Sequence, residues 1–219
     1  MDASAYTGFH EKLAKKIIPH LHADDTVCDI GCGLGLLDFQ LAPHVSEISA
    51  VDVSESAIEA LLYGAKSAGL TNIHAHCGVA EDLEGAYDII LMSLFGHIDM
   101  QELLKHCRRK IIRIAGSGRK SGLYPERHRR ETKDAVPLYR DELAGLGVRY
   151  SVELCSFEFG QPLRTWHDAE QFVLINAPYA DSGEVNEFLN ENIERTGRDD
   201  FPFYLPYQKE LGIFVIDKN

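Results

Sequence analysis

Short apolar runs alternate with segments of helical periodicity over the first half of the chain. Near the N-terminus, four apolar residues recur at helical spacing and predict an amphipathic helix that runs to His22: Phe9, Leu13, Ile17 and Leu21. Five further runs have the length and composition of strands: residues 26–30, 48–53, 72–76, 87–94 and 111–115. The run at 87–94 is almost continuously apolar, which is typical of a strand buried on both faces.

Helix signals separate these strands. Ser54 and Glu55 predict the start of a helix that Gly69 ends. Asp99 and Glu102 resemble a capping box for another helix, whose far end carries four basic residues: Lys105, Arg108, Arg109 and Lys110. Because strands and helices alternate at this spacing, right-handed crossovers must connect the strands. The sequence therefore predicts an α/β fold, with a doubly wound, mainly parallel sheet and helices on both faces.

The alternation changes after Gly116. Residues 148–159 resemble a strand, residues 166–173 a helix and residues 211–216 a clear final strand. A late hairpin of the last two strands would leave residues 160–210 as an insertion between them. Residues 201–207 are unusually aromatic for a loop, and they either line an apolar pocket or pack as a cover over the edge of the sheet.

The charge of the chain narrows the range of partners. Lys and Arg number 22 against 34 Asp and Glu, so the formal net charge is −12. This surplus of acid argues against duplex nucleic acid or an anionic membrane as the main partner. Residues 116–140 are an exception, with seven basic and three acidic residues. This basic segment either holds an anionic group of a substrate or forms a solvated helix face paired with its own acids: Glu126, Glu131 and Asp134.

Targeting and metal-binding signals are weak. No run of about 18 apolar residues is present, and the first residues lack the pattern of a signal peptide, so we expect a cytoplasmic protein. The five cysteines are odd in number and scattered, which does not fit a disulfide framework. Cys28 and Cys32 have no second Cys or His pair at zinc-finger distance, so we expect no metal site.

A glycine-rich turn follows the first predicted strand, in the order Asp29-Ile30-Gly31-Cys32-Gly33-Leu34-Gly35. In a doubly wound sheet, ligands bind outside the carboxyl ends of the strands where the strand order reverses. Glycine suits this place because the backbone turns sharply and must approach the ligand without a side chain between them. The second predicted strand ends near Asp52, whose carboxylate can accept hydrogen bonds from both hydroxyls of a ribose. The pattern therefore predicts a nucleotide-like ligand.

The spacing of the glycines distinguishes between nucleotide ligands. A dinucleotide site has the pattern G-x-G-x-x-G, whereas here Leu36 stands where that pattern needs its third glycine. The carboxylate of Asp29 would repel a pyrophosphate, but it would attract the ammonium of an amino-acid moiety, directly or through water.

At these residues the chain resembles the class I S-adenosylmethionine-dependent methyltransferases. The sequence from Asp29 to Gly35 is similar to the acid-x-Gly-x-Gly-x-Gly motif of that family, and Asp52 is similar to its ribose-binding acid. The resemblance covers about residues 25–115. It implies a seven-stranded sheet in a three-layer α/β/α arrangement, in which residues 211–216 form the antiparallel last strand. We therefore expect one domain over 1–219, with an N-terminal helix or lid at 1–24, a cofactor-binding core at 25–159 and the insertion at 160–210.

The resemblance implies that the cofactor is S-adenosyl-L-methionine and that the product is S-adenosyl-L-homocysteine. It assigns cofactor contacts to ten residues: Asp29, Gly31, Cys32, Gly33, Gly35, Asp52, Val53, Ala80, Glu81 and Ser93. One departure concerns the adenine. Members often have Gly-Asp-Ala-Glu after the third strand, whereas this chain has Val79 in place of the aspartate. The adenine would then be held by Glu81, Asp82 or backbone groups alone, unless these two acids belong to a solvated loop.

The chemistry implied is methyl transfer to a small-molecule acceptor by in-line displacement. The sulfonium is already a good leaving group, so the protein mainly supplies proximity and alignment. The resemblance places the acceptor beside the end of the fourth strand, where His97 is the candidate for a base or an acceptor-orienting group, because its side chain titrates near neutral pH. The alternative for His97 is a cap of the following helix. The acceptor and its reacting atom (O, N, S or C) are not specified by the sequence.

Other functions stay open at this point. The same fold would suit an NAD(P)-dependent oxidoreductase or a non-catalytic cofactor-binding partner subunit. An RNA methyltransferase is disfavoured, because residues 93–96 lack the Asn-Pro-Pro-Tyr type of run that nucleic-acid base methylases often carry after the fourth strand. The sequence also leaves open whether the chain forms a homodimer.

Overall fold

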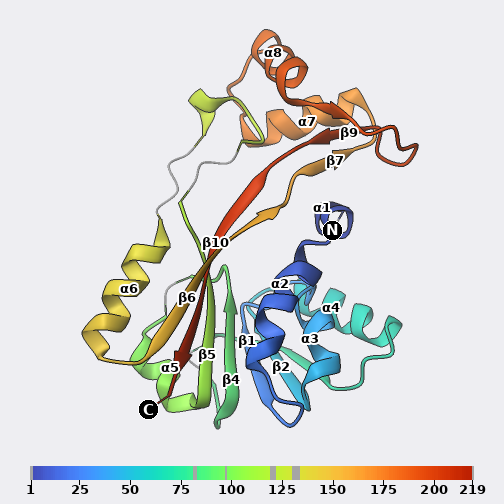
Figure 1. The fold of residues 1–219 in the computed structure, drawn as a ribbon. Helices are drawn as coiled ribbons and strands as arrows, with labels where there is room; N and C mark the ends of the chain where they lie inside the picture. The colour runs from blue at the N-terminus through green and yellow to red at the C-terminus, as the bar shows by residue number, and fades with distance from the viewer. Residues whose placement is uncertain (1, 81–82, 97, 119–121, 130–133, 219) are drawn as a thin grey trace. The chain divides into compact units, whose positions relative to one another are not determined.

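The computed structural model describes residues 2–80, 83–96, 98–118, 122–129 and 134–218 (Figure 1). These residues form two compact units, which are described separately. The sheet unit contains the described residues of 10–115, 135–155 and 212–218, and the insert unit those of 2–9, 116–134 and 156–211. The predicted insertion at 160–210 lies within the insert unit, together with N-terminal residues and the segment that follows Gly116.

The main sheet has seven strands in the order β3-β2-β1-β4-β5-β10-β6. Their bounds are β1 Thr26–Ile30, β2 Glu47–Asp52, β3 Ile73–Cys77, β4 Tyr87–Ser93, β5 Cys107–Gly116, β6 Tyr150–Glu158 and β10 Gln208–Asp217. Strands β1 to β5 pair in parallel. Strand β10 is antiparallel to β5, because Lys218 N donates to Arg109 O while Ser117 N donates to Glu210 O, so residue numbers rise on one strand as they fall on the other. The predicted fold class is confirmed.

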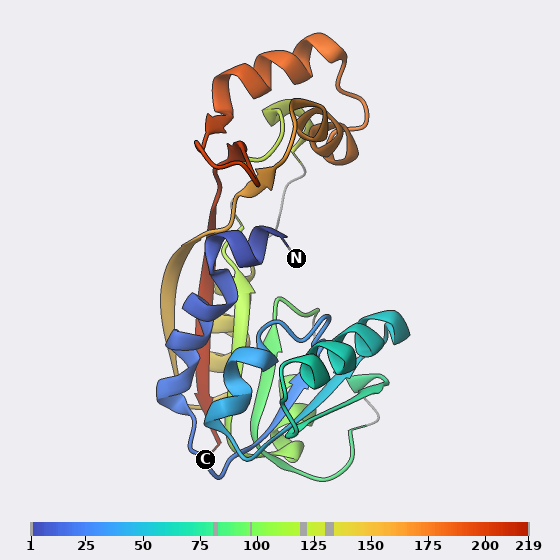
Figure 2. The same ribbon diagram turned by 90° about the vertical axis from the view of Figure 1, so that its right-hand side faces the viewer.

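Helices lie on both faces of this sheet (Figure 2). They are α2 Phe9–Ile17, α3 Asp38–Leu41, α4 Glu55–Ser67, α5 Met100–His106 and α6 Ala135–Leu146. Apolar residues of α5 and α6, among them Met100, Leu103 and Leu143, pack into one buried cluster with Ile90 of β4 and Ile111 of β5. No helix of the described residues has the length and apolar character needed to cross a membrane.

The predicted N-terminal helix is divided into shorter pieces. Gly8 adopts a left-handed backbone with φ 64° and separates α1 (Asp2–Thr7) from α2. After Ile17 the chain continues as a 3₁₀ turn, Ile18–His20, which holds Pro19 in its first positions. Proline cannot donate to the preceding turn of an α-helix, which explains why the regular helix ends before His22.

The insert unit has its own small sheet and core. Its antiparallel sheet has the order β7-β9-β8, with β7 at Gln161–Leu163, β8 at Glu194–Arg195 and β9 at Phe203–Leu205. Helices α7 (Trp166–Asn176) and α8 (Ser182–Asn192) pack their apolar residues with those of the sheet. The aromatic segment 201–207 contributes to this packing: Tyr204 is buried and its ring lies 5.0 Å from that of Tyr6.

Helix α7 begins with a capping box, which provides a test of local stability. Thr165 Oγ1 accepts a hydrogen bond from Asp168 N, and the Asp168 carboxylate accepts one from Thr165 N, both at 3.0 Å. We expect Thr165→Ala to lower the free energy of unfolding by about 1 kcal/mol, because the first turn loses a hydrogen-bond acceptor. Urea denaturation followed by circular dichroism measures this loss. Thr165→Ser keeps the hydroxyl, so equal losses in the two variants would contradict this explanation.

Candidate functional site

The glycine turn after β1 lies where the strand order reverses. Strand β1 pairs with β2 on one side and β4 on the other, so the carboxyl ends of all three strands meet at one edge of the sheet. Gly31 and Gly33 adopt left-handed backbone angles of φ 75° and 54°, which other residues rarely adopt. The turn is fixed to β2, because Gly31 N donates to Val51 O at 2.8 Å.

Two of the three glycines meet other parts of the structure closely, and one faces open space. A Cβ atom at Gly31 would lie 2.0 Å from the ring of Phe95, and one at Gly35 would lie 2.5 Å from Leu61 of α4. At Gly33 no atom of the described residues lies within 4 Å of such a Cβ. Gly33 is therefore the glycine of this turn over which a ligand has room to approach.

Asp52 ends β2 beside the turn, half-buried, and both of its carboxylate oxygens are already oriented. Oδ2 accepts a hydrogen bond from Gly33 N and Oδ1 accepts one from Ser54 N, each at 2.9 Å. Each oxygen retains a further lone pair, because a carboxylate can accept about four hydrogen bonds. The carboxylate is thus held in place by the backbone and can still accept hydrogen bonds from two hydroxyl groups.

A small cavity of about 130 Å³ lies next to Asp52. Its lining comes from the ends of β1, β2 and β3 and from the segment after β4: Ile30, Gly31, Val51, Asp52, Val53, Gly78, Val79, Ala80 and Phe95. Four of the predicted cofactor contacts are among these residues: Gly31, Asp52, Val53 and Ala80. The sequence analysis did not select Phe95, although a residue two positions after the end of a parallel strand must lie near this edge of the sheet.

The other predicted contacts have different surroundings. The Cys32 thiol lies 3.8 Å from Gly33 O, and burial raises the pKa of this thiol above its ordinary value. Gly35 packs against Leu61, as described, and Ser93 is half-buried at the end of β4. His97 and Glu81 lie outside the described residues.

Asp29 is buried within β1, where it is 2% exposed, and it has a neighbour that the sequence analysis missed. That neighbour is Asp38, the first residue of α3, which is fully buried. One carboxylate oxygen of Asp29 and both of Asp38 are buried and receive no hydrogen bond from another described residue, while the two carboxyl groups interact with each other. Burial, together with the Asp38 charge, raises the pKa of Asp29 well above its ordinary value, and burial also raises the pKa of Asp38. Buried carboxyl oxygens that receive no hydrogen bond from another described residue fit the binding of a cationic group near the glycine turn.

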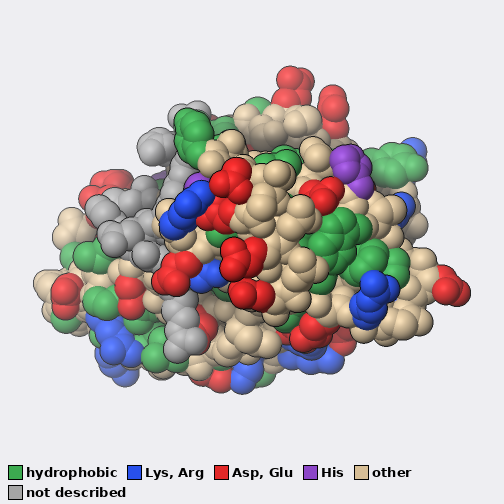
Figure 3. Space-filling model, turned by 90° about the horizontal axis from the view of Figure 1, so that it is seen from above, with side chains coloured by type: hydrophobic (Ala, Val, Ile, Leu, Met, Phe, Trp, Pro, Cys, Tyr) green, Lys and Arg blue, Asp and Glu red, His purple; other side chains and the backbone are tan. Residues whose placement is uncertain are grey.

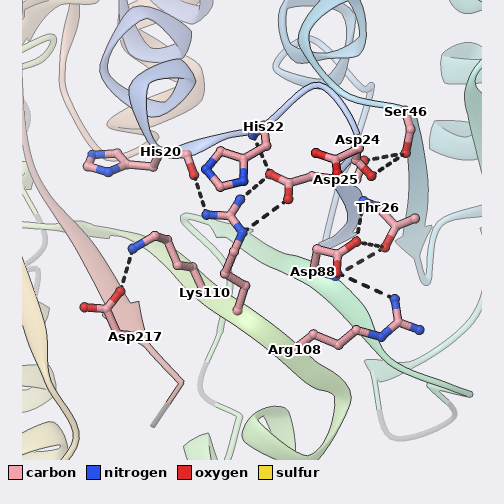
Figure 4. Close-up of polar contacts among 11 residues, drawn as sticks. His20, His22, Asp24, Asp25, Thr26, Ser46, Asp88, Arg108, Lys110 and Asp217 are labelled. Carbon is pink, nitrogen blue, oxygen red and sulfur yellow. Dashed lines mark hydrogen bonds and ion pairs between the residues drawn. The ribbon is translucent and has the colours of Figure 1, made fainter.

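A second polar cluster lies at the amino ends of β1 and β5 (Figure 4). There Asp25 accepts hydrogen bonds from Arg109 and from His22 N, and Asp88 accepts one from Thr26 N. His22, Asp24 and Asp25 each offer one ligand atom within 4.8 Å of the others. Because Asp25 is already paired with Arg109, and parallel strands bind ligands at their carboxyl ends, we assign this cluster to the stability of the fold.

Part of the chain is similar in sequence to known methyltransferases. Residues 27–112 match the family of methyltransferase domains. The chain is 40% identical over 86 residues to ubiquinone biosynthesis O-methyltransferase of Coxiella burnetii, which covers 37% of this chain and 36% of that protein. It is 36% identical over 63 residues to tRNA (uracil-5-)-methyltransferase homolog A of Mus musculus, which covers 29% of this chain and 10% of that protein. The chain thus spans well under half of the length of these relatives.

Solved structures share the whole fold at low sequence identity. The YcgJ protein of Bacillus subtilis superposes with a TM-score of 0.59 at 15% identity, covering 96% of this chain and 99% of that one. Magnesium protoporphyrin IX methyltransferase of Synechocystis, solved with bound S-adenosylmethionine, gives 0.52 at 16% identity, covering 94% of this chain and 79% of that one. Residues 27–112 therefore match the family of methyltransferase domains, and the chain shares its fold with these solved structures, in agreement with the resemblance seen at the glycine turn.

Proposed function

We propose that this chain transfers a methyl group from S-adenosylmethionine to a small-molecule acceptor. The observation that supports this most directly is the position of Asp52, whose carboxylate is held by Gly33 N and Ser54 N beside the open face of Gly33. An acid with free lone pairs at the carboxyl end of β2 suits the two hydroxyls of a ribose. The methyltransferase domain at 27–112 supports the same cofactor.

The proposed roles follow the positions of the residues around the cavity. Asp52 would accept the ribose hydroxyls, while Val53 and Ala80 would face the adenine from the cavity wall. Asp29, with Asp38 behind it, would attract the ammonium of the amino-acid portion. When bound, the cofactor supplies an activated methyl group on a positively charged sulfur. The residues of the chain orient the two reactants and exclude water, and His97 remains the proposed base or acceptor-orienting group.

The charges of the insert unit favour a small-molecule acceptor over RNA. Two described arginines of the basic segment 116–140 are already engaged: Arg127 forms an ion pair with Glu184, and Arg129 Nε donates to Tyr124 O at 2.8 Å. Acidic side chains are prominent on the face seen in Figure 3. Within the described part of the chain, these engaged arginines and the acidic face offer few sites for the phosphate contacts that supply most of the affinity for nucleic acids.

Ligand binding tests the cofactor assignment. We expect S-adenosylhomocysteine to raise the thermal midpoint of the chain, because a ligand that binds the folded state alone stabilises that state. NADH serves as the matched nucleotide control and should leave the midpoint unchanged. Stabilisation by NADH but not by S-adenosylhomocysteine would instead support an oxidoreductase.

Acceptor screening tests the remainder of the proposal. The chain is incubated with S-adenosylmethionine that carries a labelled methyl group and with either a small-molecule extract or total RNA. We expect label to enter the small-molecule fraction. Label in the RNA fraction would contradict the acceptor class, whereas cofactor binding without transfer to either fraction would favour a non-catalytic partner subunit.

A further inference from the structure

A buried guanidinium lies behind the segment that follows β4. Arg113 of β5 is 1% exposed, and no carboxylate among the described residues forms an ion pair with it at salt-bridge distance. Its Nη2 donates to Gly96 O at 3.0 Å and to the Tyr139 hydroxyl at 2.5 Å, and its Cζ lies 3.6 Å from the centre of the Tyr139 ring. Its Nη1 has no hydrogen-bond partner among the residues that the structure describes. A buried guanidinium whose hydrogen bonds are only partly satisfied lowers the stability of the fold, which favours a role for Arg113 other than stability.

The segment that Arg113 holds has an unusual backbone. Leu94, directly after β4, has φ 55°, and it is the non-glycine residue with a left-handed backbone among those that the structure describes. Leu94 N donates to Ile114 O at 2.9 Å, and two residues later Gly96 O accepts from Arg113. Consecutive residues of β5 thus fix both ends of the turn. Strained backbone persists where surrounding contacts determine it, and it is common at ligand sites.

The residue between these two anchors is Phe95. Its ring lies so close to Gly31 that a Cβ there would be 2.0 Å from Phe95 Cδ2. Phe95 also lines the cavity beside Asp52, and it is the aromatic residue among the described residues that form this lining. The turn at Leu94 and the hydrogen bond to Gly96 O lie on either side of Phe95 and therefore set the position of its ring in the cavity lining.

We propose that Arg113 is a positioning residue of the cofactor pocket: its hydrogen bond to Gly96 O keeps Phe95 against Gly31 as a wall of the pocket. This inference rests on the proposed function, since it assumes that the cavity receives the cofactor. Arg113 acts on the ligand only through Phe95, because its guanidinium is buried and faces Gly96 and Tyr139. Its removal should therefore have no further effect once Phe95 is gone.

A double-mutant cycle tests this coupling. The affinity for S-adenosylhomocysteine is measured by calorimetry for the native chain, Arg113→Met, Phe95→Ala and the double variant. We expect each single change to lower the affinity at least about tenfold, because the aromatic wall is displaced or lost. The double variant should bind no more weakly than Phe95→Ala alone. Arg113→Lys, which can still donate to Gly96 O, should recover part of the affinity.

Two controls separate positioning from general stability. Tyr139→Phe removes one partner of Arg113 but leaves its bond to Gly96 O, so its affinity should stay close to that of the native chain. Near-UV circular dichroism reports whether Arg113→Met keeps its fold, and if it does not, Arg113→Leu, which likewise cannot donate to Gly96 O, takes its place in the cycle. Additive losses in the double variant, or native affinity in the Arg113 variant, would overturn the inference while the proposed function stands. No binding by the native chain would overturn both.

Discussion

Asp52→Ala is expected to lower the affinity of the chain for S-adenosylhomocysteine about a hundredfold or more. The reason is that hydrogen bonds to a charged acceptor contribute about 1.5–3 kcal/mol each, and this carboxylate would accept two from the ribose. The substitution also leaves Gly33 N and Ser54 N without the acceptor that now holds them. Calorimetric titration measures the change.

The controls for Asp52 address charge and geometry separately. Asp24→Ala removes an equal charge from an exposed position at the opposite edge of the sheet and should leave the affinity unchanged. Asp52→Asn keeps the shape but presents donors as well as an acceptor, so an intermediate loss is expected. If Asp52→Ala bound S-adenosylhomocysteine as tightly as the native chain, the ribose assignment would be wrong.

Asp38→Asn should make the chain more stable at pH 8 and weaken its proposed cofactor binding at the same time. Burial raises the pKa of Asp38 to about 7, so between about pH 4 and 7 the folded chain retains a proton that the unfolded chain has released. Stability is therefore lost as the pH rises through this window, and asparagine removes the titration. We expect a gain of about 1–3 kcal/mol in the free energy of unfolding at pH 8 and a smaller change at pH 4.

Other acids and two thiols lie around Asp38, and their charges contribute to the same pH dependence of stability. The charges of Asp38 and Asp52 both raise the pKa of Asp29, and the charges of Asp29 and Asp38 raise the pKa of the Cys28 and Cys32 thiols. Urea denaturation at the two pH values measures stability, and Asp24→Asn is the exposed control. A gain that did not depend on pH would indicate that packing, rather than the carboxyl charge, limits stability at this position.

Local sequence patterns predict much of the fold and four of the residues that line the cavity: Gly31, Asp52, Val53 and Ala80. The apolar runs that became β1, β2, β4 and β10 are long enough to show their periodicity, and the glycine turn is encoded by adjacent residues. The strands of the insert unit could not be found in this way. Strands β8 and β9 have only two and three residues, and they carry no periodic pattern.

The missed site residues depend on contacts between distant parts of the chain. Asp38 lies on a short helix whose apolar pattern gave no reason to expect a buried acid beside Asp29. Phe95 reaches Gly31 because β5 fixes the turn that carries it. Of the basic residues that the sequence analysis placed at the end of a helix, Lys105 lies in the last turn of α5, whereas Arg108, Arg109 and Lys110 lie in β5, where Arg109 pairs with Asp25. In each case the deciding partner is remote in sequence.

The close approach of Gly35 to Leu61 has a consequence for how this motif varies. The third glycine of the turn accommodates a leucine of α4 rather than a ligand, so its small size serves the docking of two helical segments. A smaller residue at position 61 would not by itself admit a side chain at position 35, because Gly35 also has a left-handed backbone with φ 68°. At Gly33, by contrast, the described residues leave open space, so the left-handed backbone alone accounts for the glycine in this structure.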